Sequence, residues 1–410
     1  MFRFLHAADI HLDSPLRGLE RYDEVLAEEV RGAPRRALEN LVGLAIEEDV
    51  AFVLIAGDLY DGDWRDYNTG IFFVRQMRRL EKAGIPVHLV SGNHDAASCI
   101  TKRLRLPPNV VHYSEKHPET RLLPDLGVAI HGQSFAGREV REDLSSAYPA
   151  AKPGHFNIGL LHTSLDGRPG HAVYAPCNVT GLRSKGYDYW ALGHVHEREV
   201  VSQDPWIVFP GNIQGRHVRE LGSRGCSLVT VDDGMVRDLE HRSVDVVRWA
   251  RIEVDLSGIP AAEDSIDRVR QEIERVCQDA EDRTVAVRIV LGGRSPAHEA
   301  LVGNPERWIH EYREQASAVP GAAVHVERIL FETRPERELA WRVGRTEERE
   351  DALGDLLDLI ARLDQDSVDL AELGGLFDEF AKRLPAPLLG KEEGFDPTAA
   401  RTIREALPAA

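Results

Sequence analysis

The stretch Ala51-Phe-Val-Leu-Ile-Ala-Gly-Asp58 joins a short apolar run directly to a glycine and a carboxylate. Apolar runs of this length, rich in valine, leucine and isoleucine, are typical of buried strands. The glycine lets the backbone turn sharply where the strand ends, so that the carboxylate of Asp58 follows at once. The stretch therefore predicts a buried strand that places an acidic side chain at the edge of a sheet.

The same arrangement occurs at four other places in the first half of the chain. A short apolar run is followed by polar residues after Phe2–Ala7, Pro86–Val90, Asn157–Leu161 and Tyr189–Leu192. Residues 33–48 and 67–83, which separate the first three runs, carry apolar side chains at helical spacing. Strands that alternate with helices indicate an α/β fold, in which functional groups gather beyond the carboxyl ends of the strands.

The pattern changes after residue 242, and a length of 410 residues allows two or three domains. Three strand-like segments and one helical segment follow. They predict a small α/β domain over residues 244–335, behind a first domain over residues 1–243. Two apolar stripes at helical spacing then predict a helical C-terminal segment over residues 336–410.

Composition is that of an ordinary globular protein, because 42% of the residues are hydrophobic and 29% are charged. No apolar run is long enough to span a membrane, and the N-terminus lacks the basic and apolar regions of a secretory signal. The four cysteines are scattered without a Cys-x-x-Cys pair, as expected of free thiols in a reducing compartment. We therefore expect a cytoplasmic protein with no membrane contact.

The net charge of −18 taken alone argues against a nucleic-acid partner. Two local basic clusters stand within the acidic whole, one at Lys102-Arg103-Leu-Arg105 and one at Arg216-His217-Val-Arg219 with Arg224. Either cluster can contact phosphates or can simply form a solvated face, and the charge pattern leaves both readings open.

The polar residues beyond the predicted strands form a set that suits metal binding. The set comprises Asp9, His11, Asp58, Asn93, His162, His194 and His196. Carboxylate, imidazole and amide ligands together suit Mn²⁺, Fe²⁺ or Zn²⁺. There are too many ligands for one ion and about enough for two. Two metal ions about 3.5–4 Å apart commonly catalyse in-line displacement at phosphorus. Each motif alone has an ordinary explanation, such as a turn at Gly57-Asp58. Their joint occurrence at equivalent strand ends predicts a two-metal site.

These motifs resemble those of the calcineurin-like metallophosphoesterase family over about residues 1–242. The motifs similar to those of SbcD-type nuclease subunits are His6-Ala-Ala-Asp-Ile-His-Leu-Asp-Ser-Pro15, Gly57-Asp-Leu-Tyr-Asp61, Gly92-Asn-His-Asp95 and Tyr189-Trp-Ala-Leu-Gly-His-Val-His196. Phe209-Pro-Gly-Asn-Ile-Gln-Gly-Arg-His217, followed by Glu220 and Gly225-Cys226, looks closest to the YhaO-type branch of DNA repair exonucleases. The resemblance implies a four-layer α/β/β/α sandwich, and a capping domain after it that helps to select DNA.

The resemblance also implies a role for each candidate residue. Asp9, His11 and His196 would hold the first ion, and Asn93, His162 and His194 the second, while Asp58 would bridge both. His94 would face the scissile phosphate, stabilise the transition state and protonate the leaving oxygen. Asp95 would orient a neighbouring group. Two Mn²⁺ ions are the expected cofactors.

The leading hypothesis is a metal-dependent DNA exonuclease, working 3′ to 5′ on duplex ends with some endonuclease activity. By resemblance it would be the nuclease subunit of a complex with an SMC-like ATPase of the SbcC or YhaN kind, and would form a homodimer. The C-terminal helices would dock on that ATPase by their apolar stripes, or else pack on their own chain.

Two other hypotheses stay open. Phosphodiesterases of small molecules and protein phosphatases share the same metal motifs, although the long extension after residue 243 favours the nuclease. A structural partner of the ATPase is a third possibility, but a pure scaffold has no need of a complete ligand set.

Overall fold

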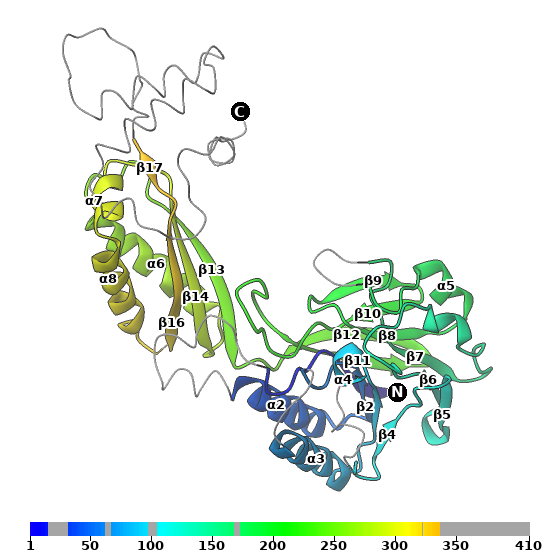
Figure 1. Cartoon of the computed structure of the whole chain (residues 1–410). Coiled ribbons are helices and arrows are strands. Elements are labelled where there is room, and N and C mark those ends of the chain that lie inside the picture. Colours follow the sequence, from blue (N-terminus) through cyan, green and yellow to red (C-terminus); the bar gives the residue numbers. More distant parts are fainter. Residues whose placement is uncertain (15–31, 62–66, 97–104, 168–172, 322, 337–410) are drawn as a thin grey trace, which may run out of the picture. The chain divides into compact units, whose positions relative to one another are not determined.

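The structure is a computed structural model, shown in Figure 1. It describes residues 1–14, 32–61, 67–96, 105–167, 173–321 and 323–336. The predicted helical segment over residues 336–410 therefore lies, from residue 337 onward, outside the described part of the chain. Met1–Glu336 form one compact unit, and the division of this unit at residue 243 stays a prediction.

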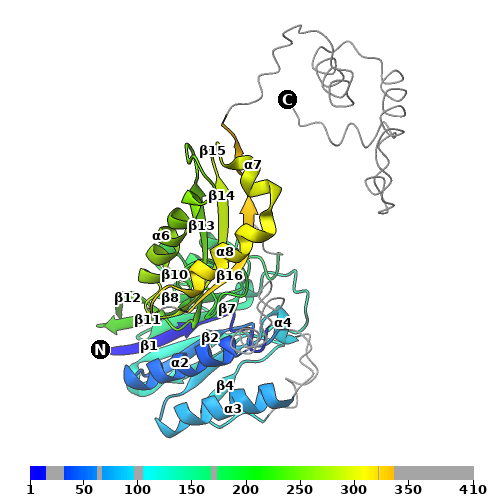
Figure 2. The same cartoon turned by 90° about the vertical axis from the view of Figure 1, so that its left-hand side faces the viewer.

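The first sheet has six strands in the order β12-β11-β1-β2-β3-β4. Its strands are β1 (Phe2–Ala7), β2 (Phe52–Ala56), β3 (Val87–Val90), β4 (Val110–His112), β11 (Gly225–Asp232) and β12 (Met235–Ser243). Strands β1 to β4 run parallel, so their carboxyl ends meet at one edge. Strand β11 pairs antiparallel with β1, and β12 pairs antiparallel with β11 at the edge of the sheet. Helices α2 (Ala33–Glu47) and α3 (Tyr67–Lys82) pack side by side on the outer face (Figures 1 and 2).

The second sheet also has six strands, in the order β5-β6-β7-β8-β10-β9. Its strands are β5 (Glu119–Leu123), β6 (Val128–Gly132), β7 (Phe156–His162), β8 (Tyr189–Gly193), β9 (Glu199–Gln203) and β10 (Trp206–Phe209). The four central strands run parallel, and the edge strands β5 and β9 run antiparallel to their neighbours. Helix α5 (Val179–Ser184) and the 3-10 turns η2 (Pro124–Leu126) and η3 (Leu144–Ala147) complete this half.

The two sheets are joined by a core of large side chains. Phe4 and Phe52 of the first sheet stack with ring centroids 4.9 Å apart, and Phe4 meets the edge of Tyr189 of the second sheet at 5.3 Å. Truncation of a buried ring such as Phe52 to alanine costs about 3–5 kcal/mol. Two stacked sheets with helices outside them confirm the predicted α/β/β/α sandwich.

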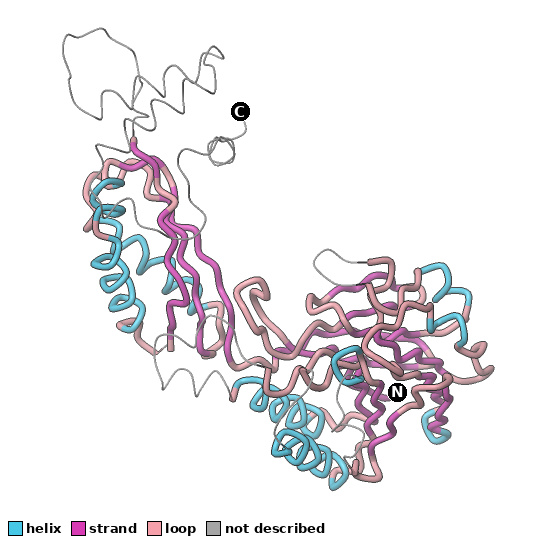
Figure 3. Tube along the Cα trace, viewed as in Figure 1, coloured by secondary structure: helices cyan, strands magenta, loops and turns pink. Residues whose placement is uncertain are grey.

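A smaller α/β arrangement follows residue 246. Its three-stranded parallel sheet consists of β13 (Val247–Asp255), β14 (Thr284–Gly292) and β16 (Val324–Phe331). Helices α6 (Asp264–Gln278) and α8 (Pro305–Ser317) cover one face of this sheet, where Trp308 and Tyr312 are buried (Figure 3). Helix α7 (His298–Gly303) and the short strands β15 (Arg294–Ser295) and β17 (Arg334–Pro335) complete it. None of the helices in the described residues is long and apolar enough to cross a membrane.

Candidate metal centre

The predicted ligands come together where strands of both sheets end. The backbone N–H of Asp9 donates to Gly57 O at 3.0 Å, and that of His11 donates to Asp58 O at 3.0 Å. These bonds tie the loop after β1 to the loop after β2. Asp9, His11 and Asp58 all have positive φ angles, of 50°, 44° and 49°. Positive φ is uncommon outside glycine, so the loops that carry these three ligands hold a strained backbone.

The first cluster is formed by Asp9, His11 and His196, whose ligand atoms lie within 4.8 Å of one another. The Nε2 atoms of His11 and His196 face each other at 3.2 Å. The Nδ1 atom of His196 donates to Glu220 Oε1 at 2.7 Å, which leaves a lone pair on Nε2 of the neutral ring. Two imidazole nitrogens at this separation can share one cation, since each would bind it at about 2.0–2.1 Å.

The second cluster is formed by Asp58, His162 and His194, again with ligand atoms within 4.8 Å of one another. His162 Nδ1 donates to the carbonyl oxygen of Ala56 at 2.8 Å, so Nε2 is the acceptor atom of the neutral ring. Asn93 Oδ1 lies 3.1 Å from this Nε2. Two acceptor atoms that converge in this way call for a cation between them.

Asp58 connects the two clusters. Its Oδ2 atom lies 3.9 Å from Nε2 of His11 and 3.5 Å from Nε2 of His162. Its Oδ1 atom accepts the backbone N–H of His94 at 3.0 Å, which fixes the orientation of the carboxylate. The position suits the bridging role that the sequence predicted for it.

The electrostatics of the buried groups also fit divalent cations. Burial, and then the nearby charge of Asp58, raise the pKa of Asp9 well above its usual value. Burial, and then the charge of Arg216, lower the pKa of His11, and burial also lowers the pKa of His162. Neutral imidazoles are the form that binds metal, and crowded carboxylates gain from a bound cation. The donor set therefore fits two divalent ions.

Two glycines make room for this arrangement. A Cβ atom at Gly92 would lie 2.3 Å from Oδ1 of Asp58, and one at Gly193 would lie 1.9 Å from the carbonyl oxygen of Ala56. Any side chain at these positions would displace the bridging carboxylate or separate the two sheets.

His94 stands beside both clusters, and one of its ring nitrogens lies within 4.8 Å of ligand atoms of His11 and Asp58, although the resemblance gives it no ligand role. Its Nδ1 atom donates to Asp61 Oδ1 at 2.9 Å. Burial alone would lower the pKa of His94, but the hydrogen bond to Asp61 and the charge of Asp58 raise it. The hydrogen bond with His94 lowers the pKa of Asp61, against the effect of burial. The contact with Asp61 thus favours the protonated form of His94, which suits a proton donor.

Asp61 had received no role from the sequence. It lies three residues after Asp58 in the quoted stretch Gly57-Asp-Leu-Tyr-Asp61, and this spacing was the available signal. Ser14 Oγ donates to its second oxygen, Oδ2, at 2.8 Å. The carboxylate of Asp61 is therefore held from both sides.

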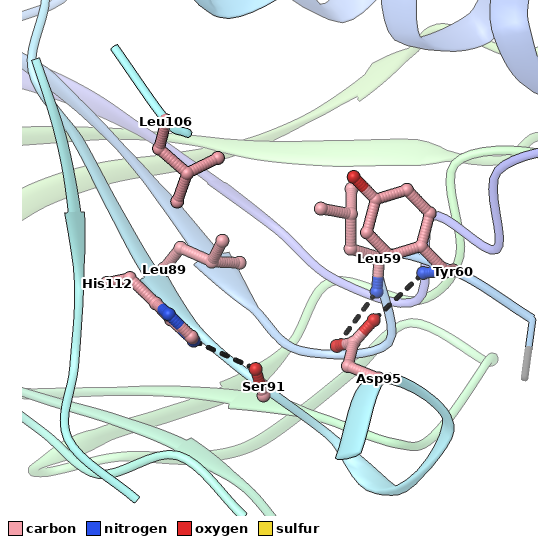
Figure 4. A pocket seen from close by; sticks show the side chains of 7 residues that line it. All are labelled: Leu59, Tyr60, Leu89, Ser91, Asp95, Leu106 and His112. Atoms are coloured by element: carbon pink, nitrogen blue, oxygen red, sulfur yellow. Dashed lines mark hydrogen bonds between the residues drawn. The ribbon is translucent and has the colours of Figure 1, made fainter. Parts of the chain in front are cut away.

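Asp95 lies behind the clusters and holds the loop that carries Asp58. Its carboxylate accepts the backbone N–H groups of Leu59 and Tyr60 at 3.2 and 2.9 Å (Figure 4). It also accepts the backbone N–H of Gly92 at 3.0 Å. Burial, and then the charge of Asp58, raise the pKa of Asp95 to about 7. These contacts agree with the orienting role that was predicted. Asp95 also lines a small cavity with Leu59, Tyr60, Leu89, Ser91, Leu106 and His112.

Comparison with known proteins bears on this centre directly. Residues 2–198 match the calcineurin-like phosphoesterase family, and residues 249–334 match the middle domain of metallophosphoesterase YhaO. Over 322 residues the chain is 33% identical to the uncharacterized metallophosphoesterase YhaO of Bacillus subtilis (strain 168), with 76% of each chain covered. The chain belongs to the calcineurin-like metallophosphoesterase family. Within the family it is of the YhaO type, as the sequence predicted.

More distant relatives are DNA double-strand break repair proteins named Mre11. The protein from Haloferax volcanii is 26% identical over 301 residues, which cover 70% of this chain but only 61% of that protein. The one from Sulfurisphaera tokodaii is 26% identical over 316 residues, which cover 73% of this chain and 76% of that protein.

Because the chain belongs to the calcineurin-like metallophosphoesterase family, it is a metal-dependent hydrolase, and the family uses divalent metals.

Proposed function

We propose that this metallophosphoesterase hydrolyses phosphodiester bonds of DNA with two divalent ions, for which Mn²⁺ is the expected species. The observation that carries the proposal is the pair of ligand clusters linked by Asp58, with the hydrogen-bonded pair His94–Asp61 beside them. The Mre11 relatives support DNA as the substrate.

The chain's own residues divide the work as follows. Asp9, His11 and His196 would hold one ion, Asn93, His162 and His194 the other, and Asp58 both. When bound, the two ions would neutralise phosphate oxygens and make hydroxide available near neutral pH. His94, whose Nδ1 is held by Asp61, would present a proton on Nε2 to the leaving oxygen. Asp95 would keep the loop of Asp58 in place.

The rest of the proposal follows the resemblance. The enzyme would act as an exonuclease, 3′ to 5′ on duplex ends and with some endonuclease activity. It would work in the cytoplasm as a homodimer with an SMC-like ATPase of the SbcC or YhaN kind. Because the chain carries a net charge of −18, we expect the isolated protein to bind DNA weakly and to depend on the ions and a few arginines for phosphate contacts.

The test is incubation of the purified chain with end-labelled linear duplex DNA in Mn²⁺, beside Mg²⁺, a chelator and the His94→Gln variant. Nucleotide release in Mn²⁺ that is lost with the chelator and in the variant supports the proposal, and the labelled end reports polarity. Cleavage of an aryl phosphodiester without any cleavage of DNA, alone or with the ATPase, would contradict DNA as the substrate.

The net charge of −18 favours a second candidate, a phosphodiesterase of small molecules. A small substrate needs no extended basic surface, because ions held by the two clusters would contact its phosphate group alone. A kcat/KM for cyclic or dinucleotide substrates above that for DNA would favour this candidate. A purely structural partner of the ATPase would show neither activity.

A further inference from the structure

The loop between β10 and β11 reaches the metal centre from outside the five predicted motifs. It contains the stretch Asn212-Ile-Gln-Gly-Arg-His-Val-Arg-Glu220, which the sequence singled out for its basic residues and for its resemblance to YhaO-type proteins, with no role for Glu220. Asn212, Gln214 and Glu220 of this loop are buried polar residues. Such residues are retained only where their polar atoms find partners, and the partners show what the loop does.

Glu220 is the residue on which these contacts converge. Its side chain is 7% exposed, and its Oε1 atom accepts the Nδ1 proton of His196 at 2.7 Å. Its Oε2 atom accepts Nδ2 of Asn212 at 2.9 Å and the backbone N–H of Arg216 at 2.6 Å. Both oxygens of a buried carboxylate are thus satisfied by donors, and one donor is a predicted metal ligand.

Glu220 determines which nitrogen of His196 is available for an ion. Arg216 Nη2 also lies 3.3 Å from Nδ1 of His196, so the two groups compete for this atom. The contact with Glu220 is shorter and charge-assisted, so Nδ1 carries the proton and Nε2 keeps its lone pair. This Nε2 is the atom that faces Nε2 of His11 at 3.2 Å in the first cluster.

The loop that carries Glu220 is fixed to the first strand of the small sheet. Gln214 donates to Val247 O at 2.6 Å and accepts the backbone N–H of Val246 at 3.0 Å. The indole N–H of Trp249 donates to the carbonyl oxygen of Gly215 at 2.9 Å, and Gly222 N donates to Trp249 O at 3.0 Å. A rigid loop holds Glu220 in one place, which a positioning role requires.

We propose that Glu220 is a positioning residue of the first metal position, where it fixes the tautomer and direction of His196 for the ion. The inference rests on the proposed two-metal centre. It adds Glu220 as a residue that acts on the ion through the ligand His196. A hydrogen bond from a ligating histidine to a carboxylate raises the basicity of the ligand, and its loss typically weakens metal binding 10–100-fold.

The test is titration of metal-free protein with Mn²⁺ by isothermal calorimetry. Wild-type protein should bind two ions, and Glu220→Gln should retain one site unchanged and bind the other about 10–100-fold more weakly. Glu240→Gln makes the same chemical change on the exposed strand β12 and should match the wild type. Two unchanged affinities in Glu220→Gln would overturn the inference.

A second variant covers the case in which Glu220→Gln fails to fold, as judged by circular dichroism of the metal-free protein. Glu220→Asp keeps the charge but withdraws the carboxylate by one methylene group. It should weaken one of the two sites by at least about fivefold, and unchanged binding would overturn the inference. Because the readout is metal affinity, a wild type that binds two ions but cleaves no DNA would contradict the proposed function while leaving this result standing.

Discussion

Nδ1 of His94 and Oδ1 of Asp61 lie 2.9 Å apart, with both side chains less than one-third exposed. Asp61 is itself held by Ser14 and lies 3.8 Å from Nη1 of Arg216. The carboxylate thus links the proposed proton donor to a nearby arginine. The contact gives Asp61 a role that can be separated from metal binding.

Asp61→Asn should reduce turnover without emptying the metal sites. The asparagine keeps the shape but removes the charge that raises the pKa of His94, so fewer molecules carry the proton for the leaving oxygen. We expect kcat to fall about 100-fold, the lower end of the usual contribution of acid–base catalysis. Steady-state kinetics and Mn²⁺ calorimetry on the same preparation check this. If the variant lost both turnover and Mn²⁺ binding, Asp61 would instead be needed to hold the ions.

Arg216→Ala should weaken substrate binding. Arg216 is 17% exposed beside His196 and Asp61, and its Nη1 atom lies 3.8 Å from Oδ2 of Asp61. A partly exposed guanidinium beside the proposed metal centre suits a contact to a phosphate oxygen. We expect KM for the phosphodiester substrate to rise about tenfold, which corresponds to about 1.4 kcal/mol. Arg219→Ala, on the exposed part of the same loop, is the matched control, and equal KM values in both variants would exclude the contact.

Gly92→Ala should disrupt metal binding through a single methyl group. The new Cβ would lie 2.3 Å from Oδ1 of Asp58, so the bridging carboxylate must move. We expect Mn²⁺ affinity to fall at both positions, as calorimetry would show. Gly43→Ala is the control, because a Cβ there meets nothing within 4 Å and the helical position favours alanine by up to about 1 kcal/mol. Normal metal binding by Gly92→Ala would mean that the loop can shift without cost.

His6 should make the metal-free protein less stable as the pH falls. Burial lowers the pKa of His6 to about 3, although its hydrogen bond to Leu192 O opposes this. The unfolded chain therefore binds a proton near pH 6.5 that the folded chain rejects, and stability falls between pH 6.5 and about 3. The slope for one such group is about 1.4 kcal/mol per pH unit.

Urea unfolding in chelator at pH 7.0 and 5.5 checks this, with His6→Gln beside the wild type. The variant has no titrating group at this position, so its stability should change less between the two pH values. Equal changes in the two proteins would mean that His6 takes up its proton in the folded state.

The sequence supported the prediction of the central strands because each is an apolar run that ends in glycine or a polar residue. Phe52–Ala56 and Tyr189–Gly193 form strands very nearly where their runs lie. The ligand positions followed, because parallel strands bring their carboxyl ends to one edge. Helices α7 and α8 were not predicted. Helix α7 is short, with Leu301 as its buried residue, whereas α8 carries Trp308, Tyr312 and Ala316 at helical spacing behind Asn304, a signal that the sequence did offer.

The sequence by itself determined the central strands and the polar residues that follow them, because local periodicity and strand-end chemistry are written in consecutive residues. It implied the two-sheet sandwich and the family only through the resemblance of these motifs to known metallophosphoesterases. Only the tertiary structure decided which ring nitrogen of His162 and which of His196 is left to face an ion. It also decided that Asp61 contacts His94 and that Glu220 contacts His196. The partners of these three contacts lie between 24 and 106 residues apart along the chain. A hydrogen bond across such a separation exists only after the sheets have stacked, because the packed core, and not the local sequence, brings donor and acceptor together.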